Sequence, residues 1–353
     1  MLNFKKFKIM SRVSDIQNFI IIACRSFLHR YDKGMKIFNH RNYLSGASFI
    51  CIGLMSVLIS CMGGSSGKIN ETPTSGDIKI YVDESFQPLL DTEIRTFTGL
   101  YRYAKIKPVY KPEVDVINDF MNDSVKVIAT SRRLTDDQIK YLRDTLIIAR
   151  TTTFAYDAIA LITNKQNRDS LLKYETVNDI FLGKITKWNE VKPNSGLENI
   201  SVIFDNTKSG NIRYFKEKFG ISENLPANFF AVNSNKEVVD YVSKNKNALG
   251  IVSVNWISDV DDSLSRSFIK KVNVEAISSP YLSGDYYYRP QQGFIYDKSY
   301  PFVREIYLIS RETFSGLGSG FIQWACAEKG QRIVLKSGLV PATMPIRLVQ
   351  IKQ

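Results

Sequence analysis

The residues VIFDNTKSGNIRYF, numbers 202–215, carry the strongest single pattern for the fold of this chain. A short apolar run leads into a polar turn with Ser209-Gly210-Asn211, and a helical pattern follows. The first backbone N–H groups of a helix lack partners within the helix, the helix dipole is positive there, and small residues let an anion approach. Strand, Ser/Gly turn and helix start therefore predict an anion site, although this segment alone fits an ordinary capped helix equally well.

The length and charge of the chain indicate a globular protein with two lobes. Its 353 residues exceed one typical domain, and 44% of them are hydrophobic. The formal charge is +12, but residues 1–60 contain nine Lys/Arg and only two Asp/Glu. From Cys61 onward, 38 basic residues stand against 33 acidic ones with no concentrated basic tract. This mild excess argues against nucleic-acid binding.

The start of the chain has the pattern of a lipoprotein export signal. Met35-Lys36 and Arg41 precede an uncharged run over residues 42–67, which is the order of a charged region, an apolar region and a processing site. Leu58-Ile59-Ser60-Cys61 resembles the bacterial lipobox, after which cleavage leaves a cysteine for acylation. A transmembrane helix is the alternative, because the apolar run is close to the minimum length that spans a bilayer.

The expected processing divides the first 76 residues into three parts. Residues 1–34 lack a clear core pattern, and we interpret them as a wrongly assigned upstream extension, with Met35 as the true start. Residues 35–60 are the signal peptide, and residues 61–76 form a flexible Gly/Ser/Thr/Pro-rich tether with lipid on Cys61. The mature protein would be anchored to the membrane in the periplasm or cell envelope.

Processing would leave few residues for catalysis or metal binding. Cys24 and Cys51 would leave with the signal, so that Cys326 remains without a disulfide partner. Both histidines, His29 and His40, lie in the discarded part. A mature chain without histidine has no His-based triad, no His-ligated zinc and no imidazole for acid/base chemistry. We therefore expect no catalytic residues, no metal and no cofactor. We also expect the protein to be a monomer.

Strand and helix patterns alternate from Asp77 onward. The first patterns are strand 78–82, helix 89–100, strand 106–110, helix 114–121, strand 125–129 and helix 135–143. The later ones are strand 157–162, helix 177–182, strand 249–253, a crossing at 300–308 and helix 320–337, which ends at Gly338. The alternation implies mainly parallel sheets, whose ligands gather at the carboxyl ends of the strands. The loops around Ser85, Ser131 and Ser209 share that edge, which predicts a common anion pocket.

Five stretches together resemble one known family, and they occur in the family's order. They are residues 180–189 (IFLGKITKWN), the Ser209-Gly210-Asn211 turn, and residues 250–254, 300–308 and 330–342. Over roughly residues 77–345 the chain resembles the substrate-binding lipoproteins of phosphate ABC transporters, the PstS-like branch of the type II periplasmic binding proteins. Phe181, Ile185 and Trp188 are expected to pack in the core.

The resemblance implies an α/β, two-lobed type II periplasmic-binding-protein fold. Each lobe would be a mainly parallel sheet flanked by helices, and two hinge crossings would join the lobes. Lobe 1 would contain residues 77–157 and 285–353, and lobe 2 residues 158–284. The lobes would close around phosphate or a similar tetrahedral oxyanion, which the protein would deliver to the permease subunits of an ABC transporter.

The resemblance also implies the ligand-binding residues. Ser85 and Phe86 would supply a hydroxyl and a backbone N–H from the first loop, and Ser131 lies in the second loop. Ser209, Gly210 and Asn211 match the family's helix-start motif, usually Ser-Gly-Thr. Hydroxyl and N–H donors hold a desolvated oxyanion through charge-assisted hydrogen bonds without a full counter-charge.

Three residues depart from the family pattern. Asn211 replaces the Thr, and Asp205 stands where many relatives have a phosphate-clamping Arg. Arg132 stands where the best-known members have an Asp that accepts a hydrogen bond from the protonated ligand and thereby disfavours sulfate. Arg132 would pair with phosphate if it faces the cleft. Alternatively it pairs with an acidic side chain or forms a solvated pair with its neighbour; the residues concerned are Glu84, Glu113, Asp115 and Arg133.

Two functions from different classes remain open on the sequence. A transport receptor would bind a small anion and close on it. An envelope sensor or adhesin on the same fold would have an altered or lost anion pocket, because Asp205, Glu84 and Glu113 would make the cleft acidic. The electrostatic sign of the cleft separates the two. An enzyme is disfavoured, since no nucleophile has a convincing base nearby.

Overall fold

The computed structural model describes residues 71–345, except Asp169, Glu223, Ser283 and Asp285. The chain divides into two compact units, Met1–Lys68 and Ile69–Gln353, and every described residue belongs to the second. The expected upstream extension, signal peptide and lipidated Cys61 lie outside the described residues and stay predictions. Strand β1 begins at Ser75, two residues before the expected start of the folded part.

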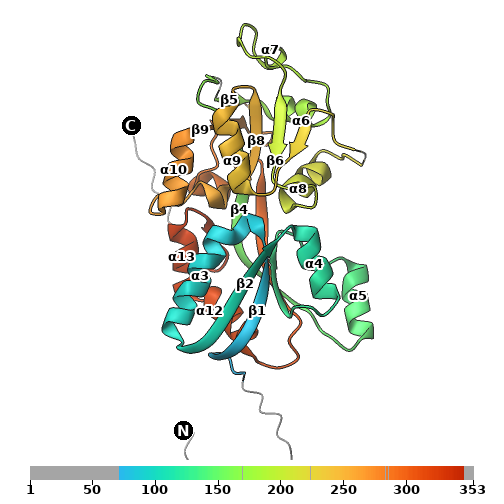
Figure 1. The fold of residues 1–353 in the computed structure, drawn as a ribbon, viewed down its shortest axis with the longest axis vertical. Helices are drawn as coiled ribbons and strands as arrows, with labels where there is room; N and C mark the ends of the chain where they lie inside the picture. The colour runs from blue at the N-terminus through green and yellow to red at the C-terminus, as the bar shows by residue number, and fades with distance from the viewer. Residues whose placement is uncertain (1–70, 169, 223, 283, 285, 346–353) are drawn as a thin grey trace, which may run out of the picture. The chain divides into compact units, whose positions relative to one another are not determined.

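The described elements follow one another as strands and helices (Figure 1). In chain order they are β1 (Ser75–Asp83), η1 (Glu84–Phe86), α3 (Gln87–Leu100), β2 (Tyr103–Lys111), α4 (Glu113–Met121), β3 (Val127–Thr130), α5 (Asp136–Asp144), β4 (Arg150–Asn164), β5 (Leu171–Leu172), α6 (Tyr174–Phe181), α7 (Trp188–Val191), β6 (Ser201–Phe204), α8 (Gly210–Lys218), β7 (Phe229–Ala231), α9 (Asn235–Lys244), β8 (Ala248–Ser253), η2 (Val254–Trp256), α10 (Ser263–Lys271), β9 (Val272–Val274), β10 (Ala276–Ser278), β11 (Tyr287–Tyr288), α11 (Gln292–Tyr296), β12 (Val303–Ser310), α12 (Leu317–Ala325), α13 (Glu328–Lys336) and β13 (Val340–Pro341).

The described strands form a large mixed sheet and a small one. The large sheet has the order β2-β1-β3-β12-β4-β8-β6-β7, with β13 and β9 also paired to β4, and the small sheet has the order β11-β10-β5. Strands β1, β2 and β3 are parallel, as are β6, β7 and β8. Strands β12 and β4 run antiparallel to their neighbours. The expectation of parallel sheets is therefore correct for the outer strands and wrong for the strands that connect them.

Strand β4 is common to two groups of elements. Its first part pairs with β12 and its last part with β8. We call one group the β1 region, with β1–β3 and helices α3, α4, α5, α12 and α13, and the other the β6 region, with β6–β8 and helices α6, α8 and α9. In Figure 1 the green strand β4 runs from one group into the other. Side chains of Asp157 to Asn164 are all buried, as a strand covered on both faces requires.

Side-chain caps explain where several helices begin. Thr135 and Gln138 form a capping box at the start of α5, in which each side chain bonds to the other's backbone N–H. Ser234 accepts a hydrogen bond from the backbone N–H of Glu237 at the start of α9. Ser209 caps α8 in the same way. The polar turns read from the sequence are thus helix starts.

The family-like apolar residues belong to the core. Phe181 and Trp188 are fully buried, and Ile185 packs against the same cluster while partly exposed. The indole N–H of Trp188 donates to the carbonyl oxygen of Asn247 at 2.9 Å, which satisfies its polar atom. Their predicted packing role is confirmed.

The last helix expected from the sequence is in fact two helices. Helix α12 ends at Ala325 and α13 begins at Glu328, and a Cβ on Gly330 would lie only 2.3 Å from the carbonyl oxygen of Ala325. The chain reverses too tightly there for one continuous helix. Gly338 has φ +78°, so the predicted left-handed position after the helix is confirmed. Throughout the described part of the chain, each helix is too short or too polar to cross a bilayer.

Candidate functional site

The Ser209 turn starts helix α8 with a side-chain cap. Ser209 Oγ accepts a hydrogen bond from the backbone N–H of Ile212 at 3.4 Å and donates one to Asp205 Oδ1 at 2.6 Å. Asp205 follows β6 and is buried. The sequence prediction of a strand, a turn and a capped helix is correct, and Asp205 holds the capping hydroxyl rather than facing solvent.

Gly210 brings two distant loops into contact at this helix start. A Cβ placed on Gly210 would lie 2.6 Å from Ser131 Oγ, 2.7 Å from Asp83 Oδ2 and 3.0 Å from Glu113 Oε1. Real Cβ atoms almost never lie closer than 3.0 Å to another atom, so a larger residue here would force the side chains of Ser131 and Asp83 to move. The Ser131 and Ser209 loops therefore meet across the gap between the β1 region and the β6 region, as the sequence predicted.

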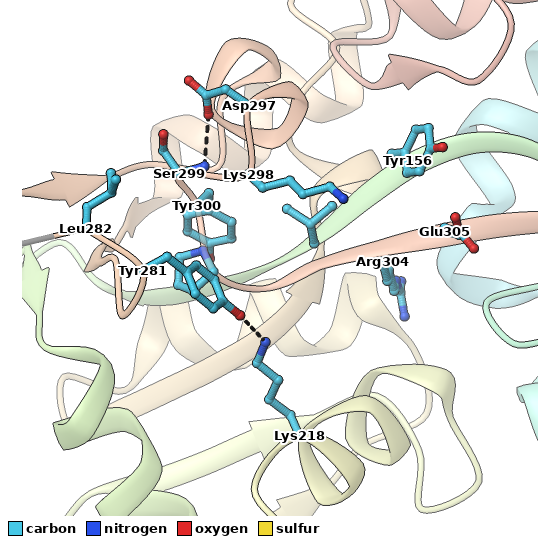
Figure 2. Close-up of a pocket in the computed structure, with 12 residues that line it drawn as sticks. Tyr156, Lys218, Tyr281, Leu282, Asp297, Lys298, Ser299, Tyr300, Arg304 and Glu305 are labelled. Carbon is cyan, nitrogen blue, oxygen red and sulfur yellow. Dashed lines mark hydrogen bonds between the residues drawn. The ribbon is translucent and has the colours of Figure 1, made fainter.

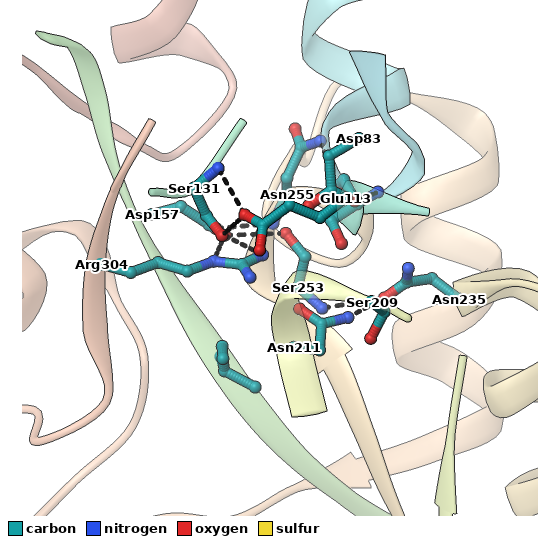
Figure 3. A network of polar contacts seen from close by, with 12 residues as sticks. Asp83, Glu113, Ser131, Asp157, Ser209, Asn211, Asn235, Ser253, Asn255 and Arg304 are labelled. Atoms are coloured by element: carbon teal, nitrogen blue, oxygen red, sulfur yellow. Dashed lines mark hydrogen bonds and ion pairs between the residues drawn. The ribbon is translucent and has the colours of Figure 1, made fainter. Parts of the chain in front are cut away.

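Glu113, the first residue of α4, lies where the donors of the second loop converge. Its Oε1 accepts hydrogen bonds from the Ser131 backbone N–H at 3.0 Å, from Ser131 Oγ at 2.5 Å and from Thr130 Oγ1 at 3.0 Å. Its Oε2 accepts from Arg213 Nε at 2.5 Å. A carboxylate of the protein itself thus takes hydrogen bonds from Ser131, one of the donors that the family resemblance assigns to the ligand (Figure 3).

Further contacts join the β1 region to the β6 region near Glu113. Lys208 Nζ lies 2.9 Å from Asp115 Oδ1, and the Val114 backbone N–H donates to the Lys208 carbonyl oxygen at 3.2 Å. The Lys208–Asp115 pair is half-exposed, so its contribution to stability is small. The Glu113–Arg213 pair is more deeply buried and has a second acceptor on α8, since Arg213 Nη1 also contacts Glu217 at 2.6 Å.

The first predicted loop contributes Ser85 and Phe86, and both are fully buried. The Ser85 backbone N–H donates to Asp83 Oδ1 at 3.0 Å, and the Ser85 carbonyl oxygen accepts from Asn255 Nδ2 at 3.1 Å. Among the described residues, neither Ser85 Oγ nor Asp83 Oδ2 has a hydrogen-bond partner. Two buried polar atoms are therefore available to a ligand at this loop.

Asn211 is tied to the start of α9 instead of to a ligand. Its Nδ2 donates to Asn235 Oδ1 at 3.2 Å, while its Oδ1 has no partner within the described part of the chain. Asn235 Nδ2 donates to Glu84 Oε2 at 2.6 Å and lies 3.3 Å from Asp205 Oδ2. Glu84 of the β1 region is therefore bound to α9 through Asn235 and does not pair with Arg132.

A buried ion pair lies beside these loops, on strands β4 and β12. Asp157 and Arg304 are directly opposite each other in the antiparallel ladder. Arg304 Nε and Nη2 both lie 2.9 Å from Asp157 Oδ2. Asp157 also accepts from Ser253 Oγ at 2.9 Å and from the Asn255 backbone N–H at 3.3 Å. The guanidinium of Arg304 is centred 4.8 Å from the Phe86 ring, which is close enough for a cation–π contact.

Burial makes several of these carboxyl groups weak acids. Desolvation, with repulsion from Glu113, raises the pKa of Asp83 to about 8, and Arg304 opposes this shift. Desolvation likewise raises the pKa of Glu84 to about 7 and raises the pKa of both Asp157 and Asp205. The buried carboxyls are therefore less negative near neutral pH than their number implies.

Glu113 behaves differently from its acidic neighbours. Burial alone would raise its pKa, but the charge and hydrogen bonds of Arg213, together with the hydrogen bonds from Ser131 and Thr130, lower its pKa overall. Glu113 is therefore ionised near neutral pH, as expected of a carboxylate held by many donors.

Arg132 is half-buried, and its Nη1 donates to the Arg133 carbonyl oxygen at 3.3 Å. Desolvation lowers the pKa of Arg132, and the charge of Glu113 opposes that shift. The Arg133 guanidinium instead lies over the Tyr307 ring at 4.8 Å. The sequence left three roles open to Arg132: a phosphate contact, a pair with an acidic side chain, and a solvated pair with its neighbour. In the structure its side chain contacts the backbone of Arg133, and the charge of Glu113 acts on it.

Five residues of the site were not identified from the sequence: Asp83, Asp157, Arg213, Asn235 and Arg304. Asp157 and Arg304 did carry a signal, because each is a charged residue close to an apolar run of its strand, residues 158–162 and 306–309. Buried charges are rare unless they are paired. Asp83 and Asn235 stand at a strand end and a helix start, where polar residues are too common to be informative.

Cavities lie next to this network. One of about 430 Å³ is lined by Arg304 together with the aromatic and basic side chains Tyr156, Tyr281, Tyr300, Lys218 and Lys298, among others (Figure 2). Lys218 Nζ contacts Tyr281 Oη there at 3.0 Å. Another of about 500 Å³ runs along the seam between α4 and α8, with Ser209 and Arg213 in its wall. Both give solvent access close to the buried polar groups.

The chemistry of the site suits a small polar ligand. The unpartnered buried atoms include acceptors, such as the Asp83 and Asn255 oxygens, and donors, such as the Ser85 hydroxyl and Arg304 Nη1. In the part of the chain that the structure describes, no group of three or more acidic, His or Cys side chains is arranged to hold a metal ion.

Comparisons with known proteins agree with this description. Residues 69–329 match the family model of the PBP (periplasmic binding protein) superfamily domain. The phosphate-binding protein PstS of Staphylococcus aureus (strain bovine RF122 / ET3-1) is 22% identical over 281 residues, or 78% of this chain and 82% of the relative.

Solved structures are also similar to this chain. A Clostridium perfringens protein solved with bound phosphate aligns with TM-score 0.64 at 24% identity, over 76% of this chain and 100% of that one. An ABC-type phosphate transport receptor from Vibrio cholerae aligns with TM-score 0.58 at 20% identity, over 76% and 100%. At these identities the solved structures establish the fold alone.

Proposed function

This chain belongs to the PBP superfamily, a family of binding proteins, and from that premise we propose that it captures inorganic phosphate, or a similar tetrahedral oxyanion, for an ABC transporter. The binding residues would be Ser85, Phe86, Ser131 and the Ser209-Gly210-Asn211 turn. The protein would catalyse no reaction and would pass its ligand to permease subunits. Relatives named for phosphate binding and phosphate transport support this assignment.

The β1 region and the β6 region are the two lobes of the proposed receptor. Lobe 1 would comprise residues 77–157 and 285–353, and lobe 2 residues 158–284. Strand β4 and the segment leading into β12 would be the two hinge crossings, since β4 pairs with strands of both regions. A ligand bound between the Ser131 and Ser209 loops would then contact both lobes and stabilise their closed arrangement.

The convergence at Gly210 is the observation that carries the proposal. Ser131 of one region and the first residues of α8 of the other lie within a few ångströms, at a helix start with small residues. Helix N-termini and hydroxyl groups are the donors that bind oxyanions in proteins. Unpartnered buried atoms at Ser85 and Asn211 lie in the same network.

Isothermal titration calorimetry tests the proposal. The purified full chain, stripped of bound ligand by unfolding and refolding, is titrated with phosphate, sulfate and molybdate. We expect stoichiometric heat with phosphate and a matching rise in melting temperature, because a ligand that binds only the folded state stabilises it. Absence of heat and of any melting shift with all three anions would overturn the oxyanion receptor.

A second candidate function is favoured by the acidic lining of the site. Asp83, Glu113, Asp157 and Asp205 are buried there, and Glu113 already takes hydrogen bonds from Ser131. An envelope sensor or adhesion lipoprotein on the same fold would have such an altered pocket. The pKa of about 8 for Asp83 reduces this negative charge near neutral pH, which keeps phosphate as the first choice. The titration with phosphate separates the two functions.

We further propose that the protein is held in the periplasm or cell envelope by lipid on Cys61, after removal of residues 35–60. Labelling with a radioactive fatty acid should mark the wild-type protein, and Cys61→Ser should abolish the label. A label that persists in the Cys61→Ser variant would contradict the lipid anchor. Mass spectrometry of the unprocessed protein tests the start at Met35, because peptides from residues 1–34 would exclude it.

A further inference from the structure

We infer that Arg304, on strand β12, is the cation that binds the captured oxyanion, and that Asp157 is its positioning residue. This inference rests on the proposed function, because it names a ligand contact within that site. Position 205, where many relatives would have a clamping Arg, is an Asp in this chain. A desolvated anion needs a compensating positive charge or many donors, so the source of that charge matters for binding.

Arg304 has one guanidinium nitrogen to spare. Its Nε donates to Asp157 Oδ2 at 2.9 Å, and its Nη2 lies 2.9 Å from the same oxygen as part of the ion pair. Among the described residues neither Nη1 nor Nη2 has a hydrogen-bond partner, and Nη1 has no ion-pair contact either. The side chain is almost completely buried, with 2% of its surface exposed. Leaving a buried charged donor unpaired is costly, so such atoms in native proteins usually face a ligand or an ordered water.

The position of Arg304 ties it to the predicted binding loops. Its guanidinium lies 4.8 Å from the ring of Phe86, whose backbone N–H is one of the predicted ligand contacts. Its charge acts on the carboxyls of Asp83 and Asp205, one beside Gly210 and the other holding Ser209. Arg304 therefore belongs to the network in which the Ser85, Ser131 and Ser209 loops meet (Figure 3).

The other arginines near the site are engaged elsewhere. Arg213 contacts Glu113 and Glu217 at 2.5 and 2.6 Å. Arg132 donates to the Arg133 carbonyl oxygen and is half-buried in the loop that precedes α5. Arg304 is also among the residues that line the cavity of about 430 Å³. It is therefore the arginine best placed to take the role that position 205 has lost.

A paired substitution isolates the binding role from the structural one. Arg304→Gln alone would leave the buried Asp157 carboxylate unpaired, which is strongly destabilising. The double variant Arg304→Gln/Asp157→Asn removes both charges and leaves a neutral amide at each position. Arg132→Gln tests the competing arginine of the same site, and Arg332→Gln, which removes an exposed arginine of α13, is the control. All are made in the full chain and titrated with phosphate by calorimetry.

We expect the double variant to melt near the wild-type temperature and to bind phosphate roughly ten- to hundredfold more weakly, as the loss of a charge-assisted hydrogen bond predicts. Arg332→Gln should stay within about threefold of the wild type, and Arg132→Gln should lose less affinity than the double variant. Side-chain ¹⁵N spectra should show one guanidinium signal that shifts with phosphate in the wild type and in Arg132→Gln but is missing from the double variant.

Two results would overturn the inference, and they differ from the failure of the proposed function. A folded double variant that binds phosphate within about threefold of the wild type assigns Arg304 to structure alone. A guanidinium shift lost in Arg132→Gln instead transfers the role to Arg132. If the wild type itself gives no heat with phosphate, the proposed function fails first and this inference falls with it.

Discussion

Glu113 Oε2 accepts a hydrogen bond from Arg213 Nε at 2.5 Å, and this contact joins helix α4 of the β1 region to helix α8 of the β6 region. The same carboxylate accepts from the Ser131 backbone N–H and hydroxyl. The donors expected for an oxyanion are thus partly occupied by the protein's own carboxylate. An incoming anion must displace Glu113, so Glu113 and the ligand compete for the same hydrogen bonds.

Glu113→Gln should therefore tighten phosphate binding, by roughly tenfold, because the competing negative charge is removed while a side chain of the same shape remains. The variant should also melt at a lower temperature without phosphate, since the pair with Arg213 is lost. Calorimetry and thermal melting measure the two effects. Asp115→Asn, which removes an exposed charge from the same helix, is the control and should change neither. Weaker phosphate binding by Glu113→Gln would show that the carboxylate assists the ligand.

Gly210→Ala should weaken phosphate binding by roughly ten- to hundredfold, because the added methyl group would overlap Ser131 Oγ and Asp83 Oδ2 and hold α8 away from them. Gly99→Ala is the matched control. A Cβ at Gly99 meets nothing within 4 Å, and this position near the end of α3 should gain up to about 1 kcal/mol from the better helix former. Binding measured by calorimetry and stability measured by urea unfolding should move in these separate directions. Unchanged binding by Gly210→Ala would place the ligand elsewhere.

The buried Asp83 should make the protein less stable as the pH rises. Its pKa of about 8 in the folded state lies above the ordinary value of 3.8. Between these values the folded state retains a proton that the unfolded state has lost, so the free energy of unfolding falls with increasing pH, by up to about 1.4 kcal/mol per pH unit for this group.

Asp83→Asn mimics the protonated form and should reduce the slope of the free energy of unfolding against pH between pH 5 and pH 8, measured by urea unfolding. Glu84 and Glu93 contribute slopes of the same sign, with pKa values of about 7 and about 9. Asp144→Asn, at an exposed site, should leave the slope unchanged.

Glu93 in helix α3 lowers the free energy of unfolding, and one substitution should remove this effect. It is fully buried, neither of its carboxyl oxygens has a hydrogen-bond partner in the described part of the chain, and burial raises its pKa to about 9. Glu93→Leu should raise the free energy of unfolding by about 1–3 kcal/mol, since an apolar group of similar size no longer pays for desolvation. Glu93→Gln retains a buried polar group and should gain little. A leucine variant less stable than the wild type would contradict this interpretation of Glu93.

The order of elements and one half of the candidate site were accessible from the sequence. Periodicity and turn residues predict local structure, which is why β1, α3 and the capped start of α8 were found within a few residues of their bounds. The closeness of Ser131 and Gly210 was also predictable from the sequence, because loops at the carboxyl ends of parallel strands lie at the same edge of the sheet.

The remaining contacts depend on pairings that no local pattern encodes. Asp157 meets Arg304 only because β4 and β12 are antiparallel neighbours in one particular register. Glu113 meets Arg213 across 100 residues, through the packing of two regions. The break between α12 and α13 arises from a close backbone approach at Gly330, although the apolar period continues through it. Strand order, register and tertiary packing determine these features, and a single sequence does not reveal them.

The register of Asp157 with Arg304 has a consequence for the speed of capture. The two residues sit opposite each other in a backbone ladder. If the proposed receptor opens, their ion pair would therefore stay intact while the contacts of Glu113 with Arg213 and of Ser131 with Gly210 would separate. An anion arriving at the separated regions would meet a cation already fixed in position. Its encounter rate would then fall with increasing salt, whereas the following closure would proceed at a rate independent of both salt and anion concentration. Capture would appear in a rapid-mixing experiment as two phases, the first bimolecular and the second saturating.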